Sequence, residues 1–164
     1  MKKLILSFSL ILFVLFCKSC ELTREPITKN ELTCKATYLN ASVAIDSLFF
    51  TENDIEYFNP STKELKFKTS FKLAEIKNFD NFRFYLGKDS LFSARLAVDE
   101  MSFMINNLVF YYNYDKGKIY LEDGYPIWID SSELATLRAQ NKAKRNTNWQ
   151  NFMDRLDYIN KLKN

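Results

Sequence analysis

The sequence predicts an α+β domain, in which an antiparallel sheet is followed by a C-terminal helix or helix pair. Apolar and polar residues alternate with a two-residue period in several segments between residue 32 and about residue 129, which indicates strands with one buried face. All three glycines lie in or beside predicted turns, whereas residues 131–163 contain neither glycine nor proline. We therefore expect a sheet of about five to seven strands, built from successive hairpins, and helical structure at 131–163.

The first part of the sheet is predicted from two alternating segments. Residues 34–38 alternate between apolar and polar side chains and indicate a strand. The next segment, 41–54, fits either a helix or a strand, and its pattern does not decide between them. Residues 55–73 predict a hairpin, because the turn-initiating pair Asn59 and Pro60 separates two apolar runs.

Two further hairpins follow the same pattern. Residues 82–98 alternate on both sides of a turn at Gly87, and residues 109–122 do so around Gly117. Glycine suits such turns because it adopts a positive φ without steric cost. Three hairpins in series predict an antiparallel meander, in which each strand pairs with the next one along the chain.

The C-terminal segment carries two helical signals. Asp130 and Glu133 have the spacing of a capping box, and Leu134 and Leu137 fit one helical face. After the sequence NKAKRNTN, which favours a break, an apolar stripe recurs with helical spacing: Trp149, Phe152, Leu156 and Ile159. We expect this stripe to cover the sheet, and two alternatives stay open: the basic helix lies on an anionic membrane surface, or it binds a protein partner.

The N-terminus has the layout of an export signal. A short positive head, Met1–Lys3, precedes the apolar run Leu4–Cys17. This run is shorter than the about 20 residues that a spanning helix needs, so a permanent transmembrane anchor is not favoured. The first alanine is Ala36, which argues against the small-x-small site of a conventional signal peptidase.

Two cysteines at the end of this run bear on how the chain is processed. Cys20 follows the small residue Ser19, and the segment resembles the signal of bacterial lipoproteins. That resemblance implies cleavage before Cys20 and attachment of a diacylglycerol to its sulfur. Cys17 is the alternative site, with the aliphatic Val14 three positions before it but the bulky Phe16 directly before it.

The resemblance divides the chain into a signal peptide at 1–19, a lipidated tether at 20–31 and a single α+β domain at 32–164. Residues 106–126 are also similar to segments of small bacterial lipoproteins, which implies lipid anchorage and no particular activity. Two or more acyl chains hold a protein stably on a membrane. We therefore expect a cell-envelope protein, anchored to a membrane that faces the periplasm or the cell exterior.

Composition excludes several kinds of site. The chain has no histidine, which excludes His-dependent triads and His-ligated metals, and its few cysteines argue against a thiolate zinc site. Its three scattered glycines argue against a phosphate-cradling loop. Once Lys2, Lys3 and Lys18 are removed with the signal, 20 basic residues face 20 acidic ones, which argues against nucleic-acid binding. No cofactor, metal or catalytic residue is predicted.

The remaining chemistry lies in carboxylates and aromatic rings. Asp99–Glu100 and Glu122–Asp123 are adjacent pairs, and neighbours on a strand point to opposite faces, so neither pair alone forms a catalytic dyad. Tyr125 and Trp128, beside Pro126 at the end of a hairpin, are the predicted ligand-binding residues. Half-exposed rings with a polar group are suited to stacking on sugars.

These features favour a non-catalytic binding or accessory module, whose partner is an envelope protein or a glycan. A carboxylate-dependent hydrolase of the glycosidase type and a structural component of an envelope assembly stay open as alternatives. Cys34 is the only thiol of the lipidated, processed chain, and we expect it to be buried.

Lipidation can be tested by labelling the full chain with a fatty acid in its native bacterium. We expect Cys20→Ala to abolish the label and Cys17→Ala to retain it, because only the first change removes the acylated sulfur. Label that survives Cys20→Ala but not Cys17→Ala would move the anchor to Cys17. A wild-type chain that never takes label would contradict the lipoprotein assignment.

Overall fold

The computed structural model describes residues 30–38, 46–71, 73–129 and 131–163. The expected signal peptide, most of the tether and the two candidate lipidation sites, Cys17 and Cys20, lie outside these residues, so their assignment stays a prediction. None of the helices in the described part is long and apolar enough to cross a membrane.

Among the described residues, eight strands form one sheet and two α-helices follow it, which confirms the predicted α+β class. The count exceeds the expected about five to seven strands, because the undecided segment 41–54 supplies a strand at Asp46–Thr51. The strands are β1 (Leu32–Tyr38), β2 (Asp46–Thr51), β3 (Ile55–Phe58), β4 (Glu64–Phe67), β5 (Phe79–Leu86), β6 (Asp89–Val98), β7 (Val109–Asn113) and β8 (Lys118–Glu122). Two short 3-10 helices, η2 (Glu52–Asp54) and η3 (Leu73–Asn78), connect strands.

The hairpins are connected differently from the expected meander. All three are present as antiparallel pairs, β3–β4, β5–β6 and β7–β8, and Gly87 and Gly117 have φ of 60° and 59° in their turns. The strand order is β2-β1-β5-β6-β7-β8-β4-β3, so β4 pairs with β8 and β6 pairs with β7 in parallel. The meander prediction is wrong because the long connection 99–108 returns the chain across the sheet, which a hairpin turn does not do.

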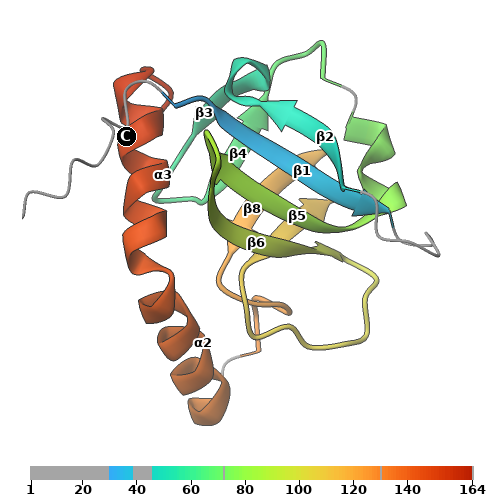
Figure 1. Ribbon diagram of the computed structural model, residues 1–164. Helices are drawn as coiled ribbons and strands as arrows, with labels where there is room; N and C mark the ends of the chain where they lie inside the picture. Colours follow the sequence, from blue (N-terminus) through green and yellow to red (C-terminus); the bar gives the residue numbers. More distant parts are fainter. Residues whose placement is uncertain (1–29, 39–45, 72, 130, 164) are drawn as a thin grey trace, which may run out of the picture.

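The sheet is curled into a half-barrel, so its two edges approach each other (Figure 1). Its edge strands β2 and β3 lie at opposite ends of the strand order but are joined only by η2. Across the interior, Phe50 of β2 packs on Phe67 of β4 with 4.9 Å between the ring centroids. Side chains from both ends of the sheet therefore meet in one core.

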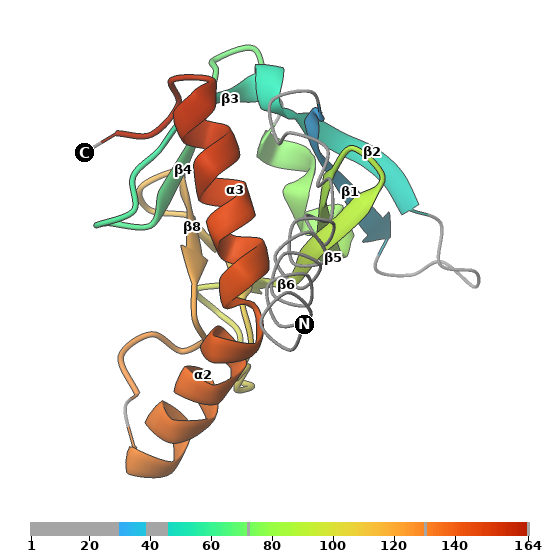
Figure 2. The same ribbon diagram turned by 60° about the vertical axis from the view of Figure 1, so that its left-hand side comes forward.

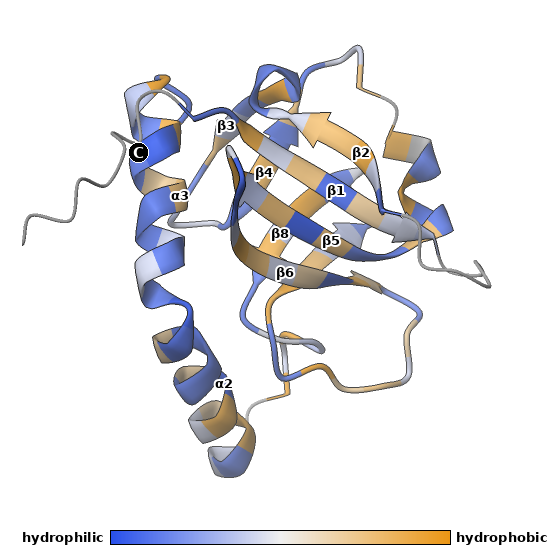
Figure 3. Ribbon diagram, viewed as in Figure 1, coloured by the Kyte–Doolittle hydropathy of each residue, from blue (hydrophilic) through white to orange (hydrophobic). Residues whose placement is uncertain are grey.

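Phenylalanine rings fill this core, and Figure 3 shows the hydrophobic residues concentrated on the strands. Phe82 and Phe110 stack with their ring centroids 4.4 Å apart. Cys34 is fully buried among these side chains, as expected, and burial raises the pKa of its thiol well above the usual value. The core depends mainly on large aromatic side chains, each of which removes a large area from water.

The helices α2 (Ser132–Lys144) and α3 (Asn146–Tyr158) are separated at Arg145, within the expected break. α3 runs along the open side of the half-barrel, whereas α2 projects beyond the sheet (Figures 1 and 2). Phe152 and Leu156 of the predicted stripe are fully buried in the core, which confirms that the stripe covers the sheet. Trp149 and Ile159 of the stripe are half-buried and pack against this core. The two alternatives for the basic helix, contact with an anionic membrane surface or with a protein partner, stay predictions.

The N-terminal cap of α2 differs from the predicted one. Ser131 caps the helix, and its hydroxyl accepts a hydrogen bond from the Leu134 backbone N–H at 3.3 Å. The expected cap, Asp130, lies outside the described residues. No side chain of α2 is buried, so Leu134 and Leu137 form no core-facing stripe.

A buried ion pair holds α3 against the sheet. Arg155 of α3 donates from Nε and Nη2 to the Glu52 carboxylate, at 2.9 and 2.5 Å. Glu52 also accepts from the Leu32 backbone N–H at 2.7 Å, and Lys161 Nζ donates to the carbonyl oxygens of Glu52 and Ile55. Glu52 therefore connects η2, β1 and α3 at the place where the two edges of the sheet meet.

These contacts determine the charge state of Glu52. Burial by itself raises its pKa, but hydrogen bonds from Arg155 and the Leu32 N–H, together with the charges of Arg155 and Lys161, lower the pKa below its usual value. The Glu52 carboxylate is therefore ionised at neutral pH, as a strong ion pair requires.

The segment after α3 covers the edge of β3. Phe58 donates its backbone N–H to the Lys161 carbonyl at 2.8 Å and accepts from the Lys163 N–H at 2.9 Å. An exposed strand edge pairs readily with other chains, so this short parallel pairing protects β3.

Arg155→Met should lower the free energy of unfolding by about 3–5 kcal/mol, because it leaves the buried Glu52 carboxylate without its cationic partner. Urea denaturation measures the loss. Lys66→Met is the matched control, since Lys66 and Glu56 form a solvent-exposed pair at 2.9 Å, which contributes little. A loss no larger than that of the control would contradict the role of the buried pair.

The same pair should make stability depend on pH in acid. Because the pKa of Glu52 is lower in the folded than in the unfolded chain, its contribution is fully present above the unfolded pKa and is lost as the pH falls through the folded pKa. The difference in unfolding free energy between wild type and Glu52→Gln should therefore shrink as the pH drops from 7 to below about 4. A difference that stays constant over this range would refute the assignment.

Candidate functional site

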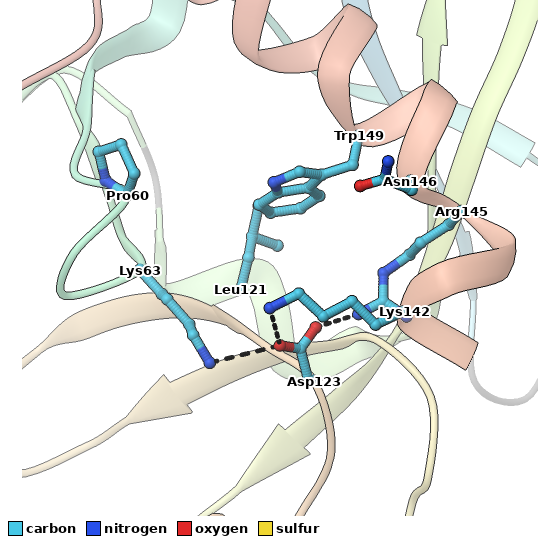
Figure 4. A pocket seen from close by; sticks show the side chains of 8 residues that line it. All are labelled: Pro60, Lys63, Leu121, Asp123, Lys142, Arg145, Asn146 and Trp149. Atoms are coloured by element: carbon cyan, nitrogen blue, oxygen red, sulfur yellow. Dashed lines mark hydrogen bonds and ion pairs between the residues drawn. The ribbon is translucent and has the colours of Figure 1, made fainter. Parts of the chain in front are cut away.

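A pocket lies where the junction of α2 and α3 faces the β3–β4 turn and the end of β8 (Figure 4). It encloses about 460 Å³, including the solvent at its mouth. The residues that line it are Pro60, Lys63, Leu121, Asp123, Lys142, Arg145, Asn146 and Trp149. These eight side chains come from three separate parts of the chain, which the fold brings together.

The helical junction supplies one wall of the pocket. Lys142, Arg145, Asn146 and Trp149 have the spacing i, i+3, i+4 and i+7, which places four side chains on one helical face. The face keeps this alignment although α2 ends at Lys144 and α3 begins at Asn146. Its position over the sheet follows from the burial of Phe152 in the next turn of α3.

The opposite wall comes from a tight turn and the last strand. Asn59 Oδ1 accepts from the Ser61 and Thr62 N–H groups, both at 2.9 Å, which builds the turn expected from the Asn59-Pro60 pair. The Lys63 carbonyl then accepts from the Leu121 N–H at 3.0 Å and fastens the turn to β8. The Lys63 side chain consequently lies beside the acidic end of β8.

Three cationic side chains converge on one carboxylate in this pocket. Asp123 lies 3.6 Å from Lys63 and 3.4 Å from Lys142, and it accepts a hydrogen bond from Arg145 Nη2 (Figure 4). Lys63 also contacts Glu122 at 2.8 Å. Even when Glu122 is counted with the pocket, three positive charges face two negative ones.

Arg145 is the most enclosed of these cations. Its side chain is only 10% exposed, and its Nη1 is buried without a hydrogen-bond partner among the described residues. Burial lowers the pKa of Arg145, and the Asp123 carboxylate opposes this effect. A buried N–H group without an acceptor is costly.

Burial and nearby carboxylates also act on the pKa of Lys63, but here the net effect is a higher pKa. Burial by itself lowers its pKa, but the hydrogen bond and charge of Glu122, with a further contribution from Asp123, raise the pKa above its usual value. The Lys63 ammonium is therefore firmly charged at neutral pH.

A neighbouring contact fixes the loop that leaves β8. Arg138 of α2 donates from Nη1 to the Ile129 carbonyl at 3.1 Å and from Nη2 to the Pro126 carbonyl at 2.9 Å. Its guanidinium lies against Gly124, where a Cβ atom would overlap Arg138 and come within 2.9 Å of the Ile105 carbonyl oxygen. Gly124 is therefore needed for this close approach of α2 to the loop.

The predicted ligand-binding residues do not form an exposed platform. Tyr125 is fully buried, and its hydroxyl donates to the Asp99 carbonyl at 3.1 Å. The expected exposure of Tyr125 is wrong because the connection 99–108 folds over it, with paired backbone hydrogen bonds of 2.8 Å between Ile105 and Tyr125. The binding role of Tyr125 and Trp128 stays a prediction. Trp128 is 64% exposed, and it lies outside the pocket.

Asp99, Glu122 and Asp123, from the two adjacent carboxylate pairs, make structural contacts. Asp99 accepts from the Tyr111 hydroxyl and from the Tyr114 N–H at 3.1 Å. Burial, followed by the hydrogen bond to Asp99, raises the pKa of Tyr111 to about 12. Glu122 and Asp123 both contact Lys63, as described above.

The sequence does not predict this pocket, although the spacing of the residues in its helical wall is a recognisable pattern. Lys142, Arg145 and Trp149 repeat at i, i+3 and i+7, which indicates one helical face with two charges and a ring. The meeting of Lys63 with Glu122, 59 positions away, depends on the pairing of β4 with β8. No local pattern indicates that pairing.

No family model, curated protein or solved structure matches the chain. Within the described ranges, no three Cys, Asp or Glu side chains are grouped so that they could hold a metal ion. The class of this protein is therefore described by its own fold and pocket. It is an α+β half-barrel with a positively charged pocket where its two C-terminal helices meet.

Asp123→Asn should destabilise the domain by about 1–3 kcal/mol, because three cations then lose their shared carboxylate. The loss should be smaller in concentrated salt, which screens the repulsion among the cations. Asp157→Asn, at an exposed carboxylate of α3, is the control. Equal thermal stability of the two variants at low salt would contradict the role assigned to Asp123.

Proposed function

We propose that the chain is a lipoprotein of the cell envelope, anchored through Cys20, whose domain acts as a non-catalytic binding module. The pocket at the helix junction is the single observation that carries the binding role, because its walls are built from three fixed elements and concentrate positive charge. The anchor rests on the N-terminal resemblance and places the domain at a membrane facing the periplasm or the cell exterior. Its partner is an envelope protein or a glycan, and nucleic acid is not expected.

The make-up of the pocket favours binding over hydrolysis. A glycosidase-type reaction uses two carboxylates across the scissile bond. Asp123 is the one carboxylate among the lining residues that the structure describes, and Lys63, Lys142 and Arg145 surround it. A pocket with one described carboxylate lacks the pair that such a reaction needs.

A structural role in an envelope assembly is the second candidate, and the exposure of α2 favours it. None of the α2 side chains is buried, so the helix presents its surface to surrounding molecules. Truncation of residues 146–164 would not test this role, because it removes Phe152 and Leu156 from the core. Position-specific cross-linking distinguishes the two roles without disturbing the fold.

A photoreactive residue at position 146, in the wall of the pocket, should form an adduct in the native bacterium under irradiation. The matched position is 140, on the exposed surface of α2 and outside the pocket. An adduct at 146 that is lost in Lys142→Gln supports ligand binding in the pocket. An adduct at 140 alone would favour the assembly role, and no adduct at either position would contradict both.

A further inference from the structure

The charge of the pocket selects for an anionic ligand. Lys63, Lys142 and Arg145 supply three positive charges, against the two negative charges of Asp123 and of Glu122, which Lys63 contacts at 2.8 Å. Lys142 is 63% exposed at the mouth, and its 3.4 Å contact with Asp123 is longer than a strong charged hydrogen bond. Its ammonium is therefore available to a second oxyanion that enters beside Asp123.

Arg145 supplies a fixed positive charge to the wall of the pocket. Its side chain is nine-tenths buried, Nη2 is bound to Asp123, and Nη1 has no acceptor among the residues that the structure describes. Arginine presents its N–H groups as a planar fork that matches carboxylate and phosphate oxygens. Because Nη1 has almost no accessible surface, Arg145 acts on an oxyanion through its charge, and the exposed Lys142 supplies the direct contact.

The upper wall of the pocket indicates what the oxyanion is attached to. The Trp149 indole lies across the pocket from Asp123, and the side chains of Pro60 and Leu121 continue its apolar surface (Figure 4). Asn146, at the same end, offers an amide that donates and accepts hydrogen bonds. An aromatic wall with nearby polar groups suits a sugar ring, which has an apolar face and hydroxyl groups at its rim.

We propose that this pocket binds a sugar that carries an oxyanion, either a carboxylate or a phosphate. The oxyanion lies against Lys142, with Arg145 and Lys63 contributing charge, and the sugar ring lies against Trp149. The pocket volume of about 460 Å³ includes solvent at its mouth, so a sugar bound there lies partly outside the pocket. This inference rests on the proposed binding function and names the ligand class for the same pocket.

Calorimetric titration of the full, detergent-solubilised chain with four probes tests the proposal. Glucuronate and glucose 6-phosphate carry both a ring and an oxyanion, glucose carries only the ring, and inorganic phosphate carries only the oxyanion. At least one charged sugar should bind about tenfold or more tightly than glucose and than inorganic phosphate. The tighter of the two charged sugars identifies the oxyanion as carboxylate or phosphate.

Lys142→Gln should weaken binding of the charged sugar by about tenfold and leave glucose unaffected. Lys144→Gln removes the same charge two positions away on α2, outside the pocket, and should leave all affinities unchanged. Both positions are exposed, so thermal unfolding should show both variants folded. Equal weakening by the two variants would show a general charge effect and overturn the site.

The proposal is also overturned if glucose or inorganic phosphate binds as tightly as both charged sugars, or if no probe binds. Cross-linking at position 146 separates this failure from failure of the binding function. An adduct at 146 without affinity for a charged sugar leaves the binding function standing and refutes the ligand class. Absence of both adduct and affinity refutes the two together.

Discussion

The arrangement of the half-barrel depends on the buried ion pair between Glu52 and Arg155. Glu52 occupies η2, the only connection between the two edge strands, and its carboxylate binds both the Leu32 N–H of β1 and the guanidinium of α3. Burying a charge is unfavourable unless it is paired and hydrogen-bonded. The pair therefore specifies one position of α3 relative to the sheet edges, and the phenylalanine core supplies most of the burial.

The position of α3 in turn determines the pocket. Phe152 and Leu156 seat the helix in the core, and the preceding turn then carries Arg145 and Trp149 over the end of β8. Asp123 meets them there and neutralises part of their charge. Structure and proposed function are thus linked: the same helix closes the core and places a cationic wall over the sheet.

Local patterns predicted much of the fold and little of the site. Alternation and turn residues predicted the three hairpins, and helical spacing predicted that Phe152 and Leu156 cover the sheet. The parallel pairing of β6 with β7 escaped prediction because it depends on a crossover rather than on a turn. Tyr125 was misplaced for a related reason, since the residues that bury it come from that crossover.

Native-state hydrogen exchange of α3 against β5 tests the central claim most directly. If the Glu52–Arg155 pair and the core make α3 part of the half-barrel, amides of Phe152–Leu156 should open with the same free energy as those of Phe82–Phe84, in a single global unfolding. Opening of α3 at a clearly lower free energy, while β5 stays protected, would contradict this account. The sheet would then close without the helix, and the pocket wall would not be fixed by the core.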